Sequence, residues 1–159
     1  MTIETALPTH LEAKSALDSL LDSFQDSRMI EETAIKTATL GISNSIQIRD
    51  YALGAIGLVL DAEDSVSFIK ALEAIAGESA GLSAIKAAYY YEAEDSIGAN
   101  LALNKSLELE NGYSLALLLR RVFSAGWPCE SFRAMRNELH PKVITGLKDL
   151  EGVAVNEKR

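Results

Sequence analysis

The feature of this sequence that most constrains its fold is an alanine- and leucine-rich stretch from residue 84 to residue 132. Alanine and leucine have high helix propensities, so the stretch favours helices over strands. Polar and turn-forming residues interrupt it at three places: Glu94-Asp95-Ser96, Glu110-Asn111-Gly112 and Gly126-Trp127-Pro128. We therefore expect three packed helical segments here, and nothing in the stretch assembles a catalytic or a metal site.

Helical periodicity extends over the rest of the chain. After Pro8, apolar residues recur at three- and four-residue steps as far as about Ser27, which is the pattern of an amphipathic helix. Further helices are predicted at 29–40, 46–60, 61–76, 79–92, 95–110 and 113–125, then around Phe132 and Met135, and finally from Pro141. We expect Gly41 to end the helix at 29–40 and Pro141 to begin the last, short one.

These segments define the fold class. They amount to eight or nine helices without a convincing strand, and the short linkers make consecutive helices antiparallel neighbours. A chain of 159 residues is expected to form one domain with one core. We therefore predict an all-α, helical-repeat-like domain over residues 1–152, a compact array of about eight antiparallel helices, with a frayed C-terminal tail at 153–159.

Two glycines stand inside the predicted helix at 46–60. Gly54 and Gly57 lie three residues apart, on neighbouring parts of one helix face. Each lowers helix stability by about 1 kcal/mol relative to alanine. A close crossing with another helix would compensate for that cost, so we expect one there.

Composition restricts the classes of partner. The formal net charge of −8 argues against general affinity for a phosphate backbone, because such binding depends on Lys and Arg, so nucleic acid is not an expected partner. No segment approaches the roughly 20 apolar residues that cross a bilayer, which predicts no membrane association. Cys129 is the only cysteine and the acidic N-terminal region does not resemble a signal peptide, so we expect a cytoplasmic protein.

The charges are unevenly distributed along this acidic chain. Residues 120–148 contain six basic residues and two acidic ones, a local charge of +4, whereas residues 61–95 contain eight acidic residues and two lysines, a local charge of −6. One interpretation is two solvated faces of opposite sign. The alternative is attraction between copies of the chain, or a basic partner held by the acidic segment.

No residue pattern indicates chemistry, so no catalytic residue, cofactor or metal is predicted. His10 and His140 are the only histidines, and neither has a second His or Cys at ligand spacing. The chain contains no glycine-rich phosphate loop and no nucleophile elbow. Cys129 follows Pro128 at a helix start, and we expect it to have a packing role.

Eight residues are candidates for an interaction surface or a pocket: Arg49, Asp50, Tyr91, Asn100, Asn104, Tyr113, Arg120 and Trp127. Arg49 and Asp50 stand near a helix start. There Arg49 either pairs with an acid of a neighbouring helix pair and fixes the stacking angle, or binds a ligand.

The remaining candidates belong to the alanine- and leucine-rich stretch. Asn100 and Asn104 lie one helical turn apart, so their amides share a face, directed toward Tyr113 or Arg120. The run Tyr89-Tyr90-Tyr91 spreads around its helix and forms no single stacking surface, so we expect at least one of these rings in the core and another toward a partner.

Two family resemblances meet in this stretch. The spacing of Ala93, Ala102, Leu107 and Tyr113-Ser114-Leu115-Ala116 resembles a tetratricopeptide-type helix pair over about one repeat, and residues 48–57 resemble the second-helix entry of HEAT repeats. The order Arg49-Asp50, Gly98-Ala99-Asn100-Leu101-Ala102-Leu103, Tyr113-Ser114-Leu115-Ala116-Leu117-Leu118 and Gly126-Trp127-Pro128 resembles the helical C-terminal half of the actinobacterial domain of unknown function 4192 family.

The second resemblance covers roughly residues 45 to 135. The chain departs from it at Glu94-Asp95-Ser96, where the family pattern has a Gly-Asp-Gly turn, and at Glu110-Asn111-Gly112, where it has Asp-Pro. The α/β part that precedes this half in the family is absent. The resemblance implies an all-helical fold and, since the family has no established activity, no particular function.

Three hypotheses for the function follow. The first is a non-catalytic helical module that binds a protein or itself, with an exposed apolar or charged face and no deep pocket. The second is a small-molecule-binding protein or enzyme with a pocket between helices near Asn100, Tyr113 and Trp127, with convergent polar groups. The third is an acidic binder of a basic protein surface, with acids arrayed along one face.

Overall fold

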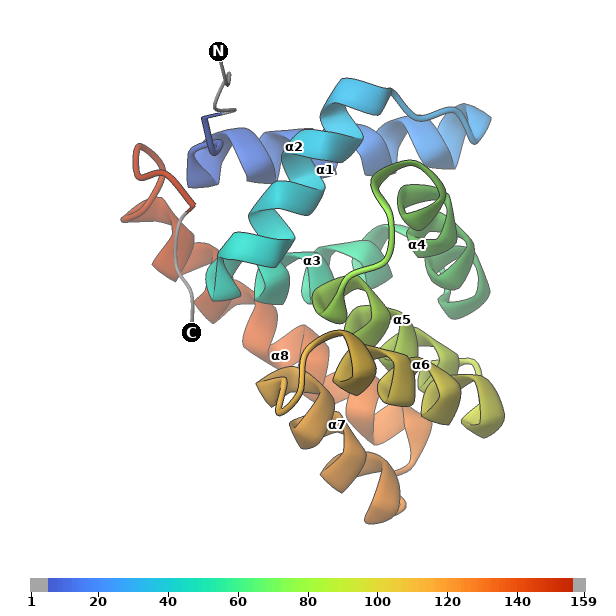
Figure 1. Ribbon diagram of the computed structural model, residues 1–159. Coiled ribbons are helices and arrows are strands. Elements are labelled where there is room, and N and C mark those ends of the chain that lie inside the picture. The colour runs from blue at the N-terminus through green and yellow to red at the C-terminus, as the bar shows by residue number, and fades with distance from the viewer. Residues whose placement is uncertain (1–5, 156–159) are drawn as a thin grey trace.

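The computed structural model describes residues 6 to 155, which form eight α-helices (Figure 1). In chain order these are α1 (His10–Ser27), α2 (Glu32–Asn44), α3 (Ile46–Val59), α4 (Ala62–Ala76), α5 (Ala80–Glu92), α6 (Ser96–Leu109), α7 (Ser114–Ser124) and α8 (Cys129–Lys148). Over these residues the only β pairing is an isolated bridge between Thr9 and Ala154. The predicted all-α class and compact helical array are confirmed.

Most helices begin where a short polar side chain can satisfy a free backbone N–H. Thr9 caps α1 in a capping box with Glu12, in which each side chain accepts a hydrogen bond from the other residue's backbone. Side-chain oxygens also cap α3, α4, α5 and α6, from Ser45, Asp61, Ser79 and Asp95. These capping residues explain why the predicted starts of these five helices agree with the structure to within a residue or two.

The helix predicted at 29–40 is wrong at both ends. α2 begins at Glu32 and continues through Gly41 to Asn44. Gly41 is buried against α1, where an added Cβ would lie 2.5 Å from the Cβ of Ala13. The glycine therefore permits a close approach of two helices and does not end one.

The two helices predicted on either side of Pro141 are one helix. α8 runs from Cys129 to Lys148 with Pro141 inside it. Proline removes one backbone hydrogen bond and costs roughly 3 kcal/mol in a helix interior. Buried residues on both sides of the proline, Phe132, Arg136, His140 and Leu147, offset that cost by packing against the rest of the molecule.

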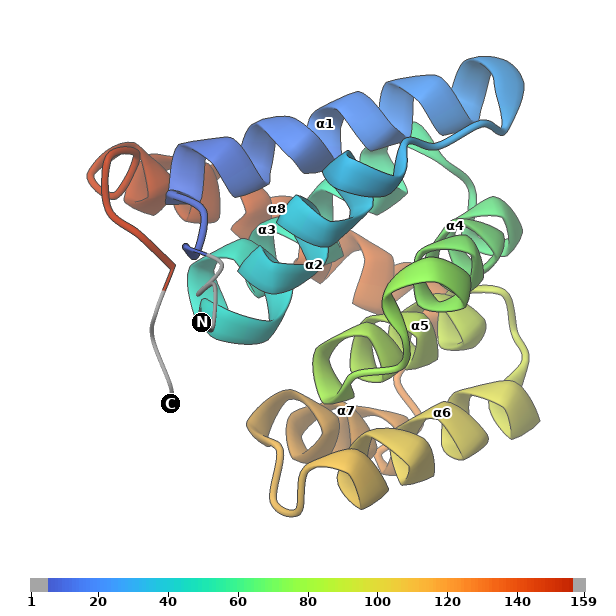
Figure 2. The ribbon, with the colours of Figure 1, turned by 45° about the horizontal axis from the view of Figure 1, so that its top comes forward.

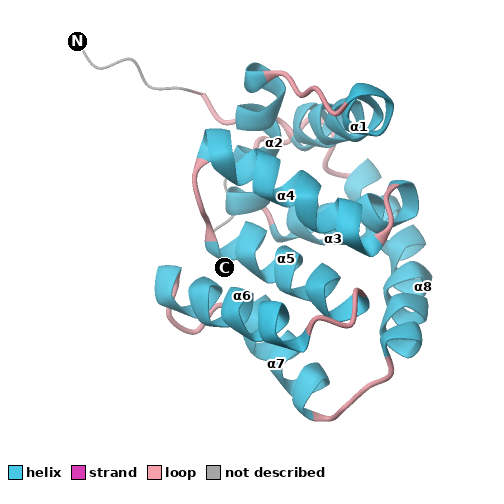
Figure 3. Ribbon diagram, turned by 90° about the vertical axis from the view of Figure 1, so that its right-hand side faces the viewer, coloured by secondary structure: helices cyan, strands magenta, loops and turns pink. Residues whose placement is uncertain are grey.

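The helices pack in groups that do not simply follow the chain. α1 packs on α2, and α5 packs between α4 and α6 (Figures 2 and 3). α8 returns to α3, its main partner, although α3 ends at Val59 and α8 begins only at Cys129. α7 packs against α5 and α6, whereas α8 packs against α3 and α5. The prediction that consecutive helices are close neighbours is therefore wrong for α7 and α8.

The close crossing expected at Gly54 and Gly57 is present, between α3 and α8. An added Cβ at Gly54 would lie 2.2 Å from Nδ1 of His140, and one at Gly57 would lie 2.6 Å from Nη1 of Arg136. Both glycines therefore make room for polar side chains of α8.

The C-terminal segment is packed as far as the structure describes it, which corrects the frayed tail predicted from residue 153. His10 donates its backbone N–H to the Val153 carbonyl at 2.8 Å, and Val155 donates to the Pro8 carbonyl at 2.8 Å. The Val155 side chain is fully buried. Residues 156–159 of that predicted tail lie outside the described residues. Between residues 6 and 155, no helix combines the length and apolarity needed to cross a membrane.

Candidate functional site

A pocket of about 340 Å³ opens between α3, α7 and α8. It exists because α7 is held by α5 and α6 while α8 is held by α3 and α5, which leaves the facing sides of α7 and α8 apart. It is a cleft open to solvent, since some of its lining side chains are half exposed, and not a sealed internal cavity. Its volume falls at the lower end of the range for small-molecule sites.

The walls of this pocket are mainly apolar. Its apolar side chains are Leu53 from α3, Leu115, Leu118, Leu119 and Val122 from α7, Trp127 from the following loop, and Phe132, Met135, Leu139 and Val143 from α8. Three of them, Leu118, Trp127 and Leu139, remain between 38% and 54% exposed. Exposed side chains of this size on facing elements form a wall that a ligand could cover.

An ion pair from the first turn of α3 forms part of the pocket wall. Nε and Nη2 of Arg49 both donate to Oδ1 of Asp50, at 3.0 and 2.9 Å. Arg49 is only 8% exposed, and its guanidinium carbon lies 5.7 Å from the ring centroid of Tyr113. Arg49 thus pairs with its own neighbour, not with an acid of another helix pair as predicted.

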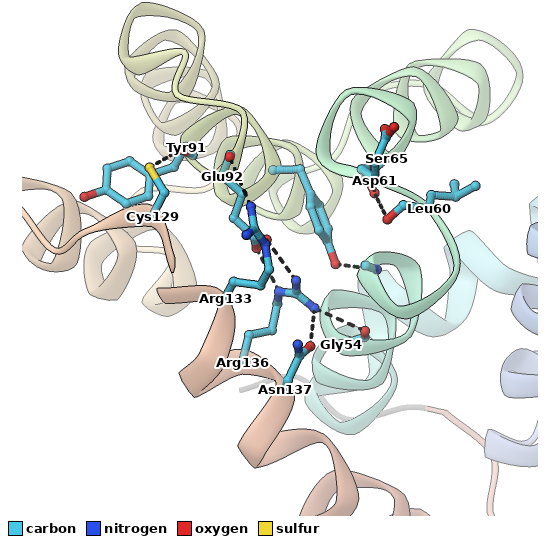
Figure 4. Close-up of polar contacts among 12 residues, drawn as sticks. Gly54, Leu60, Asp61, Ser65, Tyr91, Glu92, Cys129, Arg133, Arg136 and Asn137 are labelled. Atoms are coloured by element: carbon cyan, nitrogen blue, oxygen red, sulfur yellow. Dashed lines mark hydrogen bonds and ion pairs between the residues drawn. The ribbon is translucent and has the colours of Figure 1, made fainter. Parts of the chain in front are cut away.

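A second ion pair lies behind the pocket and joins three helices (Figure 4). Arg136 of α8 donates from Nε and Nη2 to the two carboxylate oxygens of Glu92 in α5, at 2.8 and 2.9 Å. Its Nη1 donates to Asn137 at 3.1 Å and to the Gly54 carbonyl at 3.4 Å. Arg133 donates to Glu92 at 3.2 Å. A buried bidentate pair of this kind fixes the position of α8.

His140 is the third polar group at the pocket. It lies one turn after Arg136, is 5% exposed, and its ring centroid is 5.3 Å from that of Tyr51. Its Nδ1 atom has no hydrogen-bond partner among residues 6 to 155. Burial, and next the positive charge of Arg136, lower the pKa of His140 below its ordinary value of 6.5, which keeps the ring neutral at pH 7.

The structure brings only three of the eight predicted site residues to this pocket: Arg49, Asp50 and Trp127. Asn100 and Tyr91 line a separate, smaller hollow of about 150 Å³, where the Tyr91 ring stacks on Phe123 at 4.1 Å.

Two further predicted residues form a contact between α6 and α7. Arg120 donates to Oδ1 of Asn104 at 2.5 Å, as expected for the exposed face of α6. Tyr113 lies over Arg49 and does not line the pocket.

The tyrosine run is divided as expected between core and edge. Tyr89 is fully buried; its hydroxyl accepts a hydrogen bond from the Gly57 N–H at 2.8 Å and donates to the Leu53 carbonyl. Tyr91 donates to the Trp127 carbonyl. The thiol of Cys129 donates to the Tyr91 carbonyl at 3.0 Å (Figure 4). These contacts tie the loop before α8 to the end of α5.

The polar residues of α8 were missed by reasoning from sequence. Arg136 and His140 are spaced by four residues, which places them on one helix face, but that spacing alone does not show that the face packs against α3. Gly54 and Gly57 gave the available signal, since they predicted a close helix crossing without identifying the partner helix. Within the described part of the chain, no three His, Cys, Asp or Glu side chains gather closely enough to hold a metal ion.

Comparison of the chain with protein-family models, with curated proteins and with solved structures finds no match. The resemblances to the domain of unknown function 4192 family and to helical repeats therefore stay predictions.

Proposed function

We propose that this chain is a binding protein whose pocket between α3, α7 and α8 holds a small apolar ligand. The observation that supports this proposal is the pocket itself, with mostly apolar walls and a few converging polar side chains. This combination is the usual form of a small-molecule site. The sequence favours an interaction module without a deep pocket, and the pocket shifts the proposal to the small-molecule alternative.

The proposal is tested by adding toluene to the protein and following side-chain methyl signals by NMR. Apolar cavities bind such molecules without polar contacts. We expect shifts confined to methyl groups of the pocket, for example Leu119 and Leu53. Val122→Phe places a larger side chain in the pocket and should abolish these shifts.

The matched control is Leu117→Phe, on the same helix but outside the pocket. It should leave the toluene shifts unchanged. Shifts spread over the whole surface, or shifts that persist in a folded Val122→Phe protein, would contradict the proposal. A further experiment identifies the native ligand. Both variants are purified from the natural host and extracted with organic solvent, and mass spectrometry finds the compound that Leu117→Phe retains and Val122→Phe lacks.

A second candidate function, self-association, is favoured by one exposed apolar face. Ile97 and Leu101 lie one turn apart on α6 and are 75% and 64% exposed. α6 packs on α5 and α7 with its other side. Sedimentation of the wild type and of Leu101→Glu over a range of concentrations tests this: a dimer lost in the variant supports it, and a wild-type monomer at all concentrations excludes it.

The acidic segment offers less support for binding a basic surface. Asp61 and Asp95 cap helices. Four more of its eight acids form ion pairs with basic residues: Asp64 with Arg28, Glu73 with Lys86, Glu78 with Lys105, and Glu92 with Arg133 and Arg136. Most of the local charge of −6 is thus engaged within the fold.

A further inference from the structure

We infer that the ligand of the α3, α7 and α8 pocket is an uncharged, mainly apolar molecule with one hydrogen-bonding group at the Asp50 end. This inference rests on the proposed function and specifies the chemical class of ligand. It follows from three properties of the pocket: its volume, its charge balance and the position of its free polar atoms.

The volume limits the size of the ligand. A cleft of about 340 Å³ lies at the lower end of the range for small-molecule sites, which suits a ligand of modest size. The apolar walls on α7 and α8 match the body of such a molecule. Larger ligands would extend past Leu118 and Leu139, the half-exposed residues of those walls.

The charges around the pocket are already balanced inside the protein. Arg49 is paired with Asp50, and the Arg136 guanidinium is engaged by both oxygens of Glu92. The remaining titratable side chain of the lining, His140, is buried, and its lowered pKa leaves it neutral at pH 7. The lining therefore offers no unmatched charge to a ligand.

A charged ligand is therefore disfavoured, whether it is an anion or a cation. An anion would need the Arg49 guanidinium, whose Nε and Nη2 are committed to Asp50, and would lie beside that carboxylate. A cation at Asp50 would lie beside Arg49. A charge that enters an apolar site without a counter-charge carries a large desolvation penalty.

Two polar atoms of the pocket lining, Nδ1 of His140 and Oδ2 of Asp50, have no hydrogen-bond partner among residues 6 to 155. Nδ1 of His140 is buried against Gly54 of α3, whereas the Asp50 carboxylate is half exposed and can be reached by a ligand. Nε and Nη2 of Arg49 both donate to Oδ1 of Asp50, and Oδ2 accepts no hydrogen bond within residues 6 to 155. A ligand hydroxyl or amide N–H can donate to that oxygen while the rest of the molecule contacts the α7 and α8 walls. This arrangement defines the orientation of the ligand, with its polar end at α3.

The test compares three probes with the same chain: octan-1-ol, octanoate and octylammonium. Trp127 is the only tryptophan and lines the pocket, so its fluorescence reports binding directly. At pH 7.5 we expect octan-1-ol to bind the wild type about tenfold or more tightly than either ion. Val122→Phe should abolish binding and Leu117→Phe should preserve it.

Two variants test whether the Arg49 and Asp50 pair sets this preference. Asp50→Asn leaves the Arg49 charge unmatched, so octanoate should become the tightest of the three probes. Arg49→Gln leaves Asp50 unmatched, so octylammonium should become the tightest. Circular dichroism melts establish that each variant is folded, and Asp50→Asn, at a half-exposed position, carries the test if Arg49→Gln does not fold.

The outcomes separate this inference from the proposed function. If octanoate or octylammonium binds the wild type as tightly as octan-1-ol, and Val122→Phe abolishes that binding, the pocket binds ligands but the inferred class is wrong. If Asp50→Asn and Arg49→Gln leave the order of the probes unchanged, the assigned polar end is wrong. If none of the three probes changes the fluorescence of Trp127, both the inference and the proposed function are wrong.

Discussion

At the scale of single residues, the pair of Arg136 and Glu92 is the contact on which the position of α8 most depends. Both side chains are at least 97% buried. Glu92→Leu would leave the Arg136 guanidinium buried without its counter-charge, and we expect a loss of about 3–5 kcal/mol in the free energy of unfolding, measured with urea. The double variant Glu92→Leu/Arg136→Met removes both charges and should recover most of that loss.

The control for this prediction is an ion pair at the surface, within a single helix. Glu32 and Lys36 are paired at 3.2 Å, with both side chains more than 60% exposed. Glu32→Gln should change stability by no more than about 0.5 kcal/mol. If Glu92→Leu/Arg136→Met is as unstable as Glu92→Leu alone, the loss of stability comes from lost packing and not from an unpaired charge.

His140 gives the molecule a predictable dependence on pH. Its pKa is lowered in the folded state, so the unfolded chain, with a value near 6.5, binds the proton first as the pH falls. The stability that the neutral ring contributes is present above about pH 6.5 and decreases below it, by at most about 1.4 kcal/mol per pH unit. The groups that face the ring are Tyr51, Arg136, Asp18 and Lys14.

Urea unfolding at pH 7.5, 6.5 and 5.5 measures this effect. We expect the wild type to lose stability over this range, and His140→Gln to lose less, because the glutamine does not titrate. Carboxylates contribute equally to both proteins, so the difference between the two curves isolates His140. Parallel curves for the two proteins would contradict a buried neutral histidine at this position.

At the scale of secondary-structure elements, the crossing of α3 and α8 sets how wide the pocket can be. Gly54→Ala would place a methyl group 2.2 Å from Nδ1 of His140, so the ring or the helix must move. The cost of overpacking, about 1–3 kcal/mol, should exceed the gain of about 1 kcal/mol in helix propensity. Gly146→Ala, in α8 with nothing within 4 Å of the new Cβ, should stabilise the protein by up to about 1 kcal/mol.

Thermal melts of these two variants check the prediction, since they make the same chemical change in opposite surroundings. A stabilised Gly54→Ala protein would show that α3 and α8 can separate without cost. In that case the close crossing would not be what positions His140 and Arg136 beside the pocket.

The elements also show which parts of the fold can be predicted from sequence. The starts of α3, α4, α5 and α6 were predictable because their caps, such as Asp61 and Asp95, lie next to them in the chain. Gly41 and Pro141 were misread because their effects depend on contacts with distant residues. Gly41 faces Ala13 across a helix crossing, and the cost of Pro141 is offset by packing on both sides of it. Local propensity does not contain that information.

At the scale of the whole molecule, the pocket could not be predicted from the sequence because it too depends on contacts between distant residues. Arg49, Asp50 and Trp127 were candidates, but their association with Arg136 and His140 depends on α8 returning to α3 across most of the chain. Asn100, Asn104 and Arg120 were assigned to the same site from spacing along α6 and α7. Asn100 and Asn104 share α6, and Arg120 of α7 donates to Asn104, but none of the three lines the pocket.

The meeting of the two ends of the chain is the last long-range contact, and it holds α1 beside the end of α8. Nδ1 of His10 donates to the Val153 carbonyl at 2.6 Å, and its Nε2 forms a hydrogen bond with the Ser45 hydroxyl at 2.9 Å, while the Val155 side chain is fully buried. Val155→Asp would bury a carboxylate and should open this contact. We expect hydrogen exchange at the amides of His10 and Leu11, which donate to carbonyls of the C-terminal segment, to accelerate about tenfold or more.

The control is Val153→Asp. The Val153 side chain is half exposed, so this change should leave the protection of both amides unchanged. Equal acceleration in both variants would mean that the backbone bridge, and not the buried valine, closes the molecule.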